Sequence, residues 1–572
     1  MCLRTSRKDS NGWPRTNKEG KKVEEIELYK DLVKSLKENK SFVLLAGPGA
    51  GKTKNLIDVV SHLQANKELF FNERQKVAVI TYTNAAKDEI IERLGESQDH
   101  VHCSTIHSFC WEVIKNFKTD ILLYLQHHKK ISESEDALLK REVDYKGTEY
   151  FAKDNVINLG HDDVLQIASF FLEKPKFKHI LKEKYHYILI DEFQDTNPEL
   201  LKALLSHLDG ENLVFGLFGD DWQRIYKESF PPLPQDVIEK LRIIEAKNNY
   251  RSTPRIVSLL GRLRPEYKQT SVSEEHSNRK PSLLIYTGIA GNENTLKNAL
   301  LMAEKHLEEQ GWTFSGKDAA SMLFLSRKNL AIQQGYIQLE NIYPSYGLKL
   351  RFRDLQDPLI GFFISSLEPA LQAYEQKQYW KSIKSLGLKN LIPQNKKKAK
   401  DVLELLLSKR NNMNSQKVFS CLKEIKDFSD VFPSAREKIH SEYKSEELRD
   451  VYIDLAKLPY EVIMAYARGR EEESRIGTQH SSKGRQFSKV LVVCTQNLWR
   501  DYNFKEYFSN PTKYSAIRTP TENELSTILA RNLFYVSCSR AKEELAVLID
   551  RSYTDESINN LKSIFEQNCT YV

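Results

Sequence analysis

The segment AGPGAGKT, at residues 46–53, decides how the rest of this chain is interpreted. It follows the apolar run SFVLLA (41–46), typical of a buried parallel strand, and precedes NLIDVVSHL (55–63), which has the apolar spacing of a helix. Glycines between a strand and a helix let backbone N–H groups surround a polyphosphate at the helix N-terminus. The sequence therefore predicts a phosphate-binding loop at 46–53.

Two side chains of this loop have an expected role in nucleotide binding. Lys52 is expected to contact the β- and γ-phosphates, and the Thr53 hydroxyl is expected to bind Mg²⁺. The strict form of the motif begins with glycine, where this chain has alanine. The other predicted nucleotide-binding positions are Ala46, Gly47, Pro48, Gly49, Ala50, Gly51 and Lys54.

A second apolar run, YILIDEF (187–193), supplies the acidic partners of the loop. Asp191 is predicted to hold Mg²⁺ through water, and Glu192 to polarise the attacking water as general base. The alternative, two exposed carboxylates that merely end a strand, is disfavoured by the phosphate loop upstream. Hydrolysis of ATP or GTP is the leading interpretation.

Composition limits the class of protein. The chain has 572 residues, 40% hydrophobic and 28% charged, which fits several globular domains, and its net charge of +7 is small for its size. The seven cysteines form no C-x-x-C pair, and no run approaches the length of a membrane span. Secretion and membrane insertion are disfavoured, so a cytoplasmic location is expected.

Alternating apolar runs and helical segments predict α/β architecture with parallel sheets. The runs fall into one group that ends near residue 220 and another that starts near 282, which predicts two sheets. Two stretches with helical spacing predict helical inserts at about 105–180 and 357–468. The predicted parts are a basic flexible tail (1–22), a first domain (23–262) and a second domain (263–572). The further strand-like runs are KVAVIT (76–81), LVFGLFG (213–219), SLLIYT (282–287), SMLFLS (321–326) and KVLVVCT (489–495).

Seven segments in one order resemble the motifs of the UvrD/Rep/PcrA helicases of superfamily 1. The string IDEFQDTN (190–197) resembles their second motif. Together with the phosphate loop, the other segments are YTNAAKDEI (82–90), STIHSF (104–109), GDDWQRIY (219–226), NNYRSTP (248–254), TQHSSKGRQF (478–487) and LFYVSCSRAKEEL (533–545). This resemblance implies two RecA-like P-loop motor domains, each with a helical insert, and ATP and Mg²⁺ in the cleft between them.

The resemblance also implies roles for residues outside the phosphate loop. Gln223 would sense the γ-phosphate, and Tyr250 would stack on the adenine. Arg251 and Arg540 would act as arginine fingers, because fixed cations meet the charge that develops on the γ-phosphate. Gln486 stands where the family has a nucleotide-linked glutamate.

The same resemblance implies contacts with single-stranded or tailed duplex DNA. Tyr82 would stack on a base, although a plain core aromatic is the alternative for this residue. The family's base-stacking tryptophan is replaced by glutamate at 228, which leaves Trp222 or Phe230 as candidate substitutes. The expected backbone contacts are Thr83, Asn84 and His107 in the first domain, and Thr478 and His480 in the second.

Two functions remain open from the sequence, and a third is disfavoured. The first is a 3′-to-5′ translocase or helicase that hydrolyses ATP. The second is a nucleotide-gated sensor subunit that assembles with a separate nuclease. The shortened second insert supports this second function. With this insert, the chain is similar in build to the compact helicase subunits of Gabija-type anti-phage systems. A metabolic P-loop kinase would leave the DNA-side motifs unexplained.

Overall fold

The computed structural model places most of the chain, and two compact units can be described separately. Unit 1 consists of Met1–Leu283, Trp499–Ala546 and Tyr553–Cys569, and unit 2 of Leu284–Leu498, Val547–Ser552 and Thr570–Val572. Of the predicted tail (1–22), residues 1–18 lie outside the described part. The described residues are 19–70, 72, 74–95, 100–129, 133–146, 151–153, 155–208, 213–273, 277–316, 318–387, 393–423, 446–471, 475–480, 482–495, 501–513 and 520–572.

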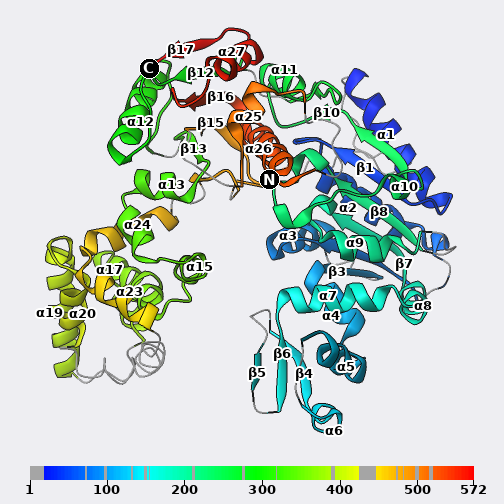
Figure 1. The fold of residues 1–572 in the computed structure, drawn as a ribbon, viewed down its shortest axis with the longest axis horizontal. Helices are drawn as coiled ribbons and strands as arrows, with labels where there is room; N and C mark the ends of the chain where they lie inside the picture. Colours follow the sequence, from blue (N-terminus) through cyan, green and yellow to red (C-terminus); the bar gives the residue numbers. More distant parts are fainter. Residues whose placement is uncertain are drawn as a thin grey trace, which may run out of the picture. The chain divides into compact units, whose positions relative to one another are not determined.

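Unit 1 contains a six-stranded sheet in the order β3-β2-β7-β8-β1-β9, in which every neighbouring pair is parallel (Figure 1). The strand β1 ends where the phosphate loop begins, and β7 ends at Asp191, two places away in the sheet. The carboxyl ends of parallel strands share one edge, so both predicted motifs meet there. The strands are β1 (Phe42–Ala46), β2 (Lys76–Thr81), β3 (Val101–Thr105), β7 (Tyr185–Asp191), β8 (Val214–Gly219) and β9 (Arg242–Ala246).

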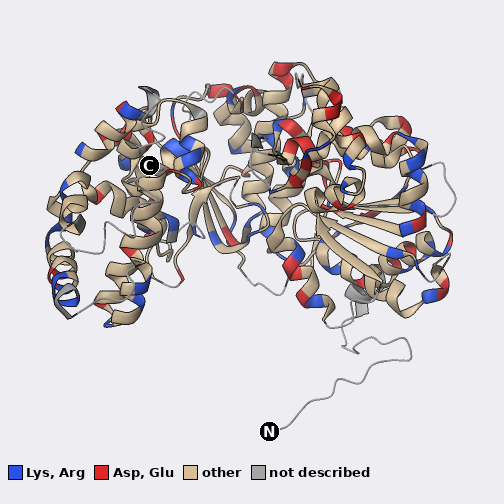
Figure 2. Ribbon diagram, turned by 90° about the horizontal axis from the view of Figure 1, so that it is seen from below, with Lys and Arg blue, Asp and Glu red and all other residues tan. Residues whose placement is uncertain are grey.

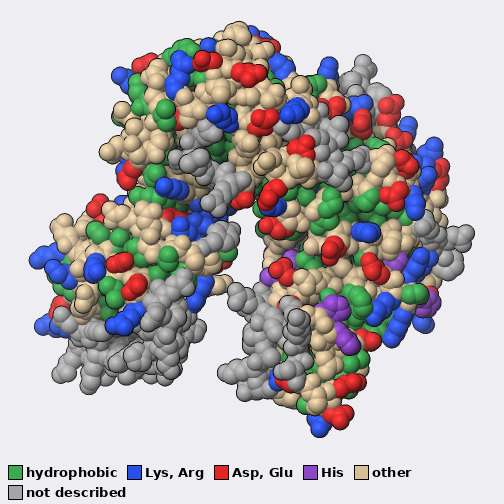
Figure 3. All heavy atoms as spheres, in the orientation of Figure 1, with side chains coloured by type: hydrophobic (Ala, Val, Ile, Leu, Met, Phe, Trp, Pro, Cys, Tyr) green, Lys and Arg blue, Asp and Glu red, His purple; other side chains and the backbone are tan. Residues whose placement is uncertain are grey.

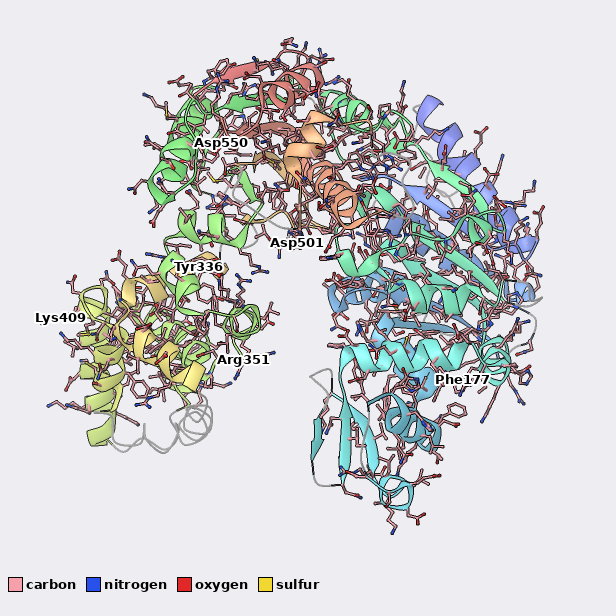
Figure 4. All side chains as sticks on the ribbon, in the orientation of Figure 1. Phe177, Tyr336, Arg351, Lys409, Asp501 and Asp550 are labelled. Atoms are coloured by element: carbon pink, nitrogen blue, oxygen red, sulfur yellow. The ribbon has the colours of Figure 1, made fainter. Side chains whose placement is uncertain are left out.

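Helices cover both faces of this sheet, because its strands are apolar on both sides. On β1, Phe42 and Leu44 pack with one set of helices, and Val43 with the other. The first face carries α1 (Glu19–Lys37), α2 (Lys52–Ala65) and α3 (Asn84–Leu94). The second face carries α4 (Ile106–Ile114), α5 (Lys118–Lys129), α7 (His161–Leu172), α8 (Pro175–Lys184) and α9 (Pro198–Leu205). Figure 4 labels Phe177 of α8, whose side chain belongs to this second core.

The first insert differs from the prediction of a mostly helical stretch at 105–180. Besides α4–α8, including α6 (Glu135–Leu138), it holds a three-stranded sheet in the order β4-β6-β5. These strands have only three or four residues, too few for an apolar alternation to be recognised. They are β4 (Glu142–Tyr145), β5 (Phe151–Lys153) and β6 (Val156–Leu159).

A second six-stranded sheet has the order β14-β13-β15-β16-β12-β17, and β13 is parallel to both of its neighbours. The predicted α/β class with two sheets is confirmed. The chain passes from unit 1 into unit 2 within β16. The strands are β12 (Ser282–Ile285), β13 (Ser321–Phe324), β14 (Ile476–Thr478), β15 (Phe487–Val493), β16 (Ala541–Ile549) and β17 (Cys569–Tyr571).

The rest of unit 2 is helical in its described part, and Figure 4 labels Tyr336, Arg351 and Lys409 among these helices. The first group is α12 (Glu293–Glu308), α13 (Arg327–Gln334), α14 (Ile337–Ile342), α15 (Tyr346–Arg353) and α16 (Pro358–Phe362). The second is α17 (Glu368–Glu375), α18 (Tyr379–Ser385), α19 (Pro393–Lys409), α20 (Ser415–Lys423), α23 (Glu446–Lys457) and α24 (Tyr460–Glu471).

A late segment of the chain belongs to unit 1, unlike in the linear division at residue 263. The helix α26 (Glu522–Cys538) packs against α11 (Pro254–Leu263) and the short turn η3 (Asp221–Gln223), so its contacts group it with the first sheet. The remaining elements of unit 1 are α10 (Gln235–Ile238), β10 (Asn248–Asn249), β11 (Thr270–Ser271), α25 (Phe504–Ser509) and α27 (Asp555–Ile564).

Candidate nucleotide-binding site

The phosphate loop of unit 1 depends on two glycines with positive φ. Gly49 and Gly51 both have φ of 76°, a conformation that side chains with a Cβ rarely adopt. A Cβ on Gly49 would also lie 2.6 Å from the Oδ1 atom of Asn249. The helix α2 begins at Lys52, directly after Gly51. Its N-terminal N–H groups and positive dipole end therefore face the place where the loop can hold an anion.

Asn249 fixes the loop to the segment that carries the predicted adenine and arginine residues. Its Nδ2 atom donates to the Pro48 carbonyl at 2.9 Å, and its Oδ1 atom accepts from the backbone N–H of Arg251 at 3.0 Å. The backbone N–H of Tyr250 donates to the Gly49 carbonyl at 2.9 Å. One buried amide thus holds together two motifs that are 200 residues apart in sequence.

The two predicted carboxylates lie at the head of α2. Glu192 accepts a hydrogen bond from the Nζ atom of Lys52 at 2.7 Å, and Gln194 donates to the same carboxylate. Burial, and then the neighbouring Glu192 charge, raise the pKa of Asp191 to about 7. Glu192 itself has φ of 49°, in the left-handed region. Such strained non-glycine positions occur often at functional sites.

Gln223 connects to these carboxylates through Asp220. The Nε2 atom of Gln223 donates to Asp220 Oδ2 at 3.1 Å, and the Asp220 backbone N–H donates to Gln194 Oε1 at 3.1 Å. Since Gln194 also donates to Glu192, an unbroken run of hydrogen bonds joins Gln223 to Glu192. The predicted γ-phosphate sensor and the predicted general base therefore hold one another in place.

Both predicted arginine fingers lie in unit 1, within the field of Glu192. Burial lowers the pKa of Arg251 to about 10, and the Glu192 charge opposes this shift. Burial, and then repulsion by Arg251, lower the pKa of Arg540 to about 9, again opposed by Glu192. The Arg251 guanidinium donates to the Ser539 carbonyl at 3.2 Å, and Arg540 donates to the Val536 carbonyl at 3.0 Å. Two desolvated cations therefore lie near the Glu192 carboxylate. One is Arg251, and the other is Arg540, which follows the end of α26.

Tyr250 is 41% exposed, so its ring offers a face for stacking. It lies beside Gly51, and Lys54 stands 5.9 Å above its centroid. Lys54 also binds Glu25 of α1 at 2.9 Å, and Tyr250 and Lys54 both hydrogen-bond the Glu25 carboxylate, which lowers its pKa against the effect of burial. This stacking position is adjacent to the phosphate loop, as a nucleotide requires.

The predicted DNA contacts of unit 1 lie at the ends of β2 and β3. Tyr82 is 43% exposed and stacks on Tyr226, with ring centroids 6.4 Å apart and planes at 22°. The Thr83 hydroxyl caps α3 by accepting a hydrogen bond from the backbone N–H of Ala86 at 3.1 Å. Asn84 is exposed to solvent. His107 packs on His161 at 4.5 Å, and burial lowers its pKa to about 4.

Trp222, a candidate base-stacking residue, is only 6% exposed and does not offer a face to solvent. The Arg531 guanidinium lies 4.0 Å from the centroid of its ring, and Arg264 lies at 5.2 Å. That candidate is therefore wrong: Trp222 is a packing residue.

Three predicted positions belong to unit 2. Thr478 is buried at the end of β14, and Gln486 is exposed just before β15. Burial, and then the charge of Arg327, lower the pKa of His480 to about 4, so this histidine is neutral at pH 7. The structure thus gathers the nucleotide residues of unit 1 at one sheet edge and describes these three within a separate unit.

Five residues of the unit 1 network were not predicted as site residues. Asp220, Asn249 and Gln194 lie inside the quoted motifs, so the motifs were a signal that could have found them. Arg264 and Tyr267 lie outside every motif. Tyr267 accepts a hydrogen bond from the backbone N–H of Gly47 at 3.2 Å, a contact 220 residues apart in sequence that only the fold creates.

Comparison with known proteins gives matches over different lengths. A family model described as an AAA domain matches residues 30–229. The Gabija protein GajB of Bacillus cereus (strain HuB5-5) is 22% identical, over 93% of this chain and 96% of that protein. The ATP-dependent DNA helicase Rep of Buchnera aphidicola (subsp. Acyrthosiphon pisum) is 29% identical, over 38% of this chain and 41% of Rep. The ATP-dependent DNA helicase PcrA of Bacillus subtilis (strain 168) is 27% identical, over 42% of this chain and 38% of PcrA.

The chain thus spans about two fifths of the length of the Rep and PcrA relatives and nearly the whole length of GajB. Within the placed ranges, no helix combines the length and apolar character that crossing a bilayer requires. These similarities confirm the resemblance to the UvrD/Rep/PcrA helicases of superfamily 1, and they relate the chain along nearly all of its length to a Gabija protein.

Proposed function

We propose that this protein is a UvrD-type ATP hydrolase that moves along single-stranded DNA in the 3′-to-5′ direction. The observation that carries the proposal is the pair of Lys52 and Glu192, 2.7 Å apart at the N-terminus of α2. Asp191 lies beside this pair, and the guanidinium groups of Arg251 and Arg540 lie within the electrostatic field of Glu192. A cationic loop, a base and two further cations are the groups that phosphoryl transfer to water needs.

The Lys52–Glu192 pair supports a defined sequence of events. The phosphate oxygens of ATP compete with Glu192 for the ammonium group of Lys52, because both are anionic acceptors. Once Lys52 is drawn to the phosphates, the Glu192 carboxylate is released from its ion pair and polarises the attacking water. Gln194 holds Glu192 in position during this exchange, and Gln223 is connected to Gln194 through Asp220. Arg251 and Arg540 then stabilise the charge on the γ-phosphate.

The donor atoms fit Mg²⁺, which prefers hard oxygen ligands and is bound by one or two carboxylates together with substrate phosphates. Thr53 and Asp191 would hold the ion, one with a hydroxyl and the other with a buried carboxylate. Among the described residues, no group of three or more His, Cys, Asp and Glu could hold a metal by itself. The ion would neutralise phosphate charge when ATP brings it to the site.

The DNA part of the proposal rests on Tyr82 and on the family resemblance. An exposed tyrosine ring, supported from beneath by Tyr226, is a stacking platform that accepts any base. Basic and acidic residues are interspersed along the ribbons of both units (Figure 2), which agrees with contacts made by hydroxyls and amides rather than by many lysines. The 3′-to-5′ direction comes from the resemblance alone.

A second function is favoured by one observation: the match to GajB covers almost all of both chains, whereas the helicase matches are partial. In this alternative the same ATP site gates a partner that contains a nuclease, and the protein unwinds little DNA by itself. The two functions share the hydrolytic chemistry and differ in what the hydrolysis drives.

The test is steady-state ATP hydrolysis by the purified protein with and without single-stranded DNA, using Lys52→Ala as the blank. Strong stimulation by DNA, followed by unwinding of a 3′-tailed duplex by the isolated protein, supports the motor. Hydrolysis without unwinding, which changes on addition of a nuclease partner, supports the gated subunit. Absence of hydrolysis with and without DNA rejects the first proposal.

A further inference from the structure

A buried ion pair lies beside the hydrolytic network of unit 1. The guanidinium of Arg264, which is 8% exposed, donates to Asp220 Oδ1 at 2.8 Å. Asp220 is 2% exposed. Two charges taken out of water carry a large desolvation cost, which only good geometry and further hydrogen bonds offset. The hydrogen bonds and packing around this buried pair indicate what it does.

The Asp220 carboxylate accepts three hydrogen bonds. Its Oδ2 atom accepts from Gln223 Nε2 at 3.1 Å, and its Oδ1 atom accepts from the Trp222 backbone N–H at 3.1 Å as well as from Arg264. Its own backbone N–H donates to Gln194, which donates to Glu192. The Asp220 carboxylate thus fixes Gln223, and the Asp220 backbone N–H connects the same residue to the general base through Gln194.

Arg264 is packed between aromatic rings beside Asp220. Its guanidinium lies 4.5 Å from the ring centroid of Tyr267 and 5.2 Å from that of Trp222, and it also interacts electrostatically with Tyr535. On its outer side, its Nε atom lies 3.9 Å from Glu266. Tyr267 in turn accepts from the backbone N–H of Gly47, in the phosphate loop. The Arg264 side chain therefore contacts both Tyr267, which bonds the phosphate loop, and Asp220, which is connected to the general base.

The same cluster reaches the helix that carries the second arginine finger. Tyr535 of α26 packs edge-on against Trp222 at 5.4 Å, and Asn532 of α26 donates to the carbonyls of Asp221 at 3.2 Å and Arg224 at 2.8 Å. The helix ends at Cys538, two residues before Arg540. A displacement of α26 is therefore transmitted to the turn η3, on which Gln223 lies.

We propose that the Arg264–Asp220 pair is a positioning device for ATP hydrolysis, which aligns Gln223 and Glu192 with the phosphate loop and with α26. Neither residue touches the reacting atoms; both act through Gln223 and Glu192. The inference rests on the proposed ATPase function and names residues outside its catalytic set. A misplacement of about 1 Å in such a site lowers a rate by up to ~100-fold, so the effect falls on kcat rather than on nucleotide binding.

The experiment measures kcat with saturating ATP and single-stranded DNA, the Kd of a fluorescent ATP analogue, and Tm, for the wild type, three test variants and one control variant. Arg264→Met is expected to lower kcat at least ~10-fold with Kd changed less than ~3-fold, since alignment is lost and the loop remains. Arg264→Lys keeps the charge and is expected to recover part of the lost kcat. The control is Arg262→Met on α11, which removes an arginine paired with Glu566 at 2.8 Å and is expected to leave kcat unchanged.

A third variant separates positioning from stability. Arg264→Met leaves Asp220 buried without its partner, and this can prevent folding. The double variant Asp220→Asn with Arg264→Met removes both charges and is expected to regain most of the lost Tm while kcat stays low. Wild-type kcat in the folded double variant, or in a folded Arg264→Met, overturns the positioning role. Absence of turnover in the wild type overturns the ATPase proposal and this inference with it.

Discussion

At Glu192 the chain adopts a left-handed backbone conformation, with φ of 49°, and the carboxylate is held by Lys52 at 2.7 Å. We expect Glu192→Gln to slow ATP hydrolysis by about 100-fold or more while ATP still binds, because an amide keeps the hydrogen bond from Gln194 but cannot accept a proton. Single-turnover hydrolysis and binding of a fluorescent ATP analogue measure the two effects. Glu199→Gln, at an exposed position on α9, is the matched control.

Arg540 is the other residue whose environment predicts a measurable effect. Its burial lowers its pKa to about 9, so it is still mainly a cation at pH 7. We expect Arg540→Ala to lower kcat by about 100-fold and to change ATP affinity only a few-fold, since a finger acts mainly on the transition state. Arg255→Ala, on the exposed side of α11, should leave both quantities unchanged. An equal loss of affinity and rate would place Arg540 in ground-state binding instead.

The helix α26 has a capping box at its N-terminus, and its C-terminal end lies near the proposed hydrolytic site. Thr521 and Glu524 form a capping box: the Thr521 backbone N–H donates to Glu524 at 2.9 Å, and the Thr521 hydroxyl accepts from the Glu524 backbone at 3.4 Å. We expect Thr521→Ala to lower the free energy of unfolding by about 1 kcal/mol. Urea denaturation measures this change, and Thr521→Ser should retain most of the stability. No difference between the two variants would show that the cap is dispensable.

Strands that are buried on both faces could be predicted from the sequence, and edge strands could not. The central runs of the two sheets, such as YILI and KVAVIT, are continuously apolar, and each forms a strand. The strands β3 and β9, at the edges of the first sheet, contain polar residues such as His102 and Glu245, and they went unpredicted. The small sheet of the first insert was missed because its strands have only three or four residues.

The candidate site was predictable where chemistry is encoded in short motifs. The elements that position these residues lie next to them in the sequence. The phosphate loop stands between β1 and α2, and Asp191 and Glu192 stand at the end of β7. Asn249 was accessible in principle, because it stands next to Tyr250 in a quoted motif. Arg264 could not be predicted, since its role depends on Asp220 and Tyr267, which only the packing of α11 brings around it.

Over the whole molecule, burial keeps several histidines neutral. Burial lowers the pKa of His107, His186, His207 and His480 to about 4, below the usual value of 6.5. Figure 3 shows histidine side chains (purple) at the surface of unit 1. Between pH 6.5 and 4 the unfolded chain binds protons that the folded protein does not. The stabilisation is complete above pH 6.5 and is lost as the pH falls toward 4.

We therefore expect Tm to fall as the pH is lowered from 7.5 to 5, and we expect His207→Gln to reduce this dependence. His207 is 2% exposed at the end of α9, so its uncharged form is strongly favoured in the folded state. Circular dichroism melts at several pH values measure the slope. His127→Gln, at an exposed position, should leave the slope unchanged. A variant slope equal to that of the wild type would mean that other groups control the acid transition.

The membership of α26 in unit 1 has a consequence for the order in which the protein is made. The six strands of the first sheet lie between Phe42 and Ala246, whereas Arg540 and the helix before it come almost 300 residues later. At a synthesis rate of about 5–20 residues per second, tens of seconds separate the phosphate loop from its second arginine. A nascent chain can thus form the loop proposed to hold ATP well before the proposed second arginine finger has been made. Full ATP turnover is therefore expected only after residue 540 has been added to the chain.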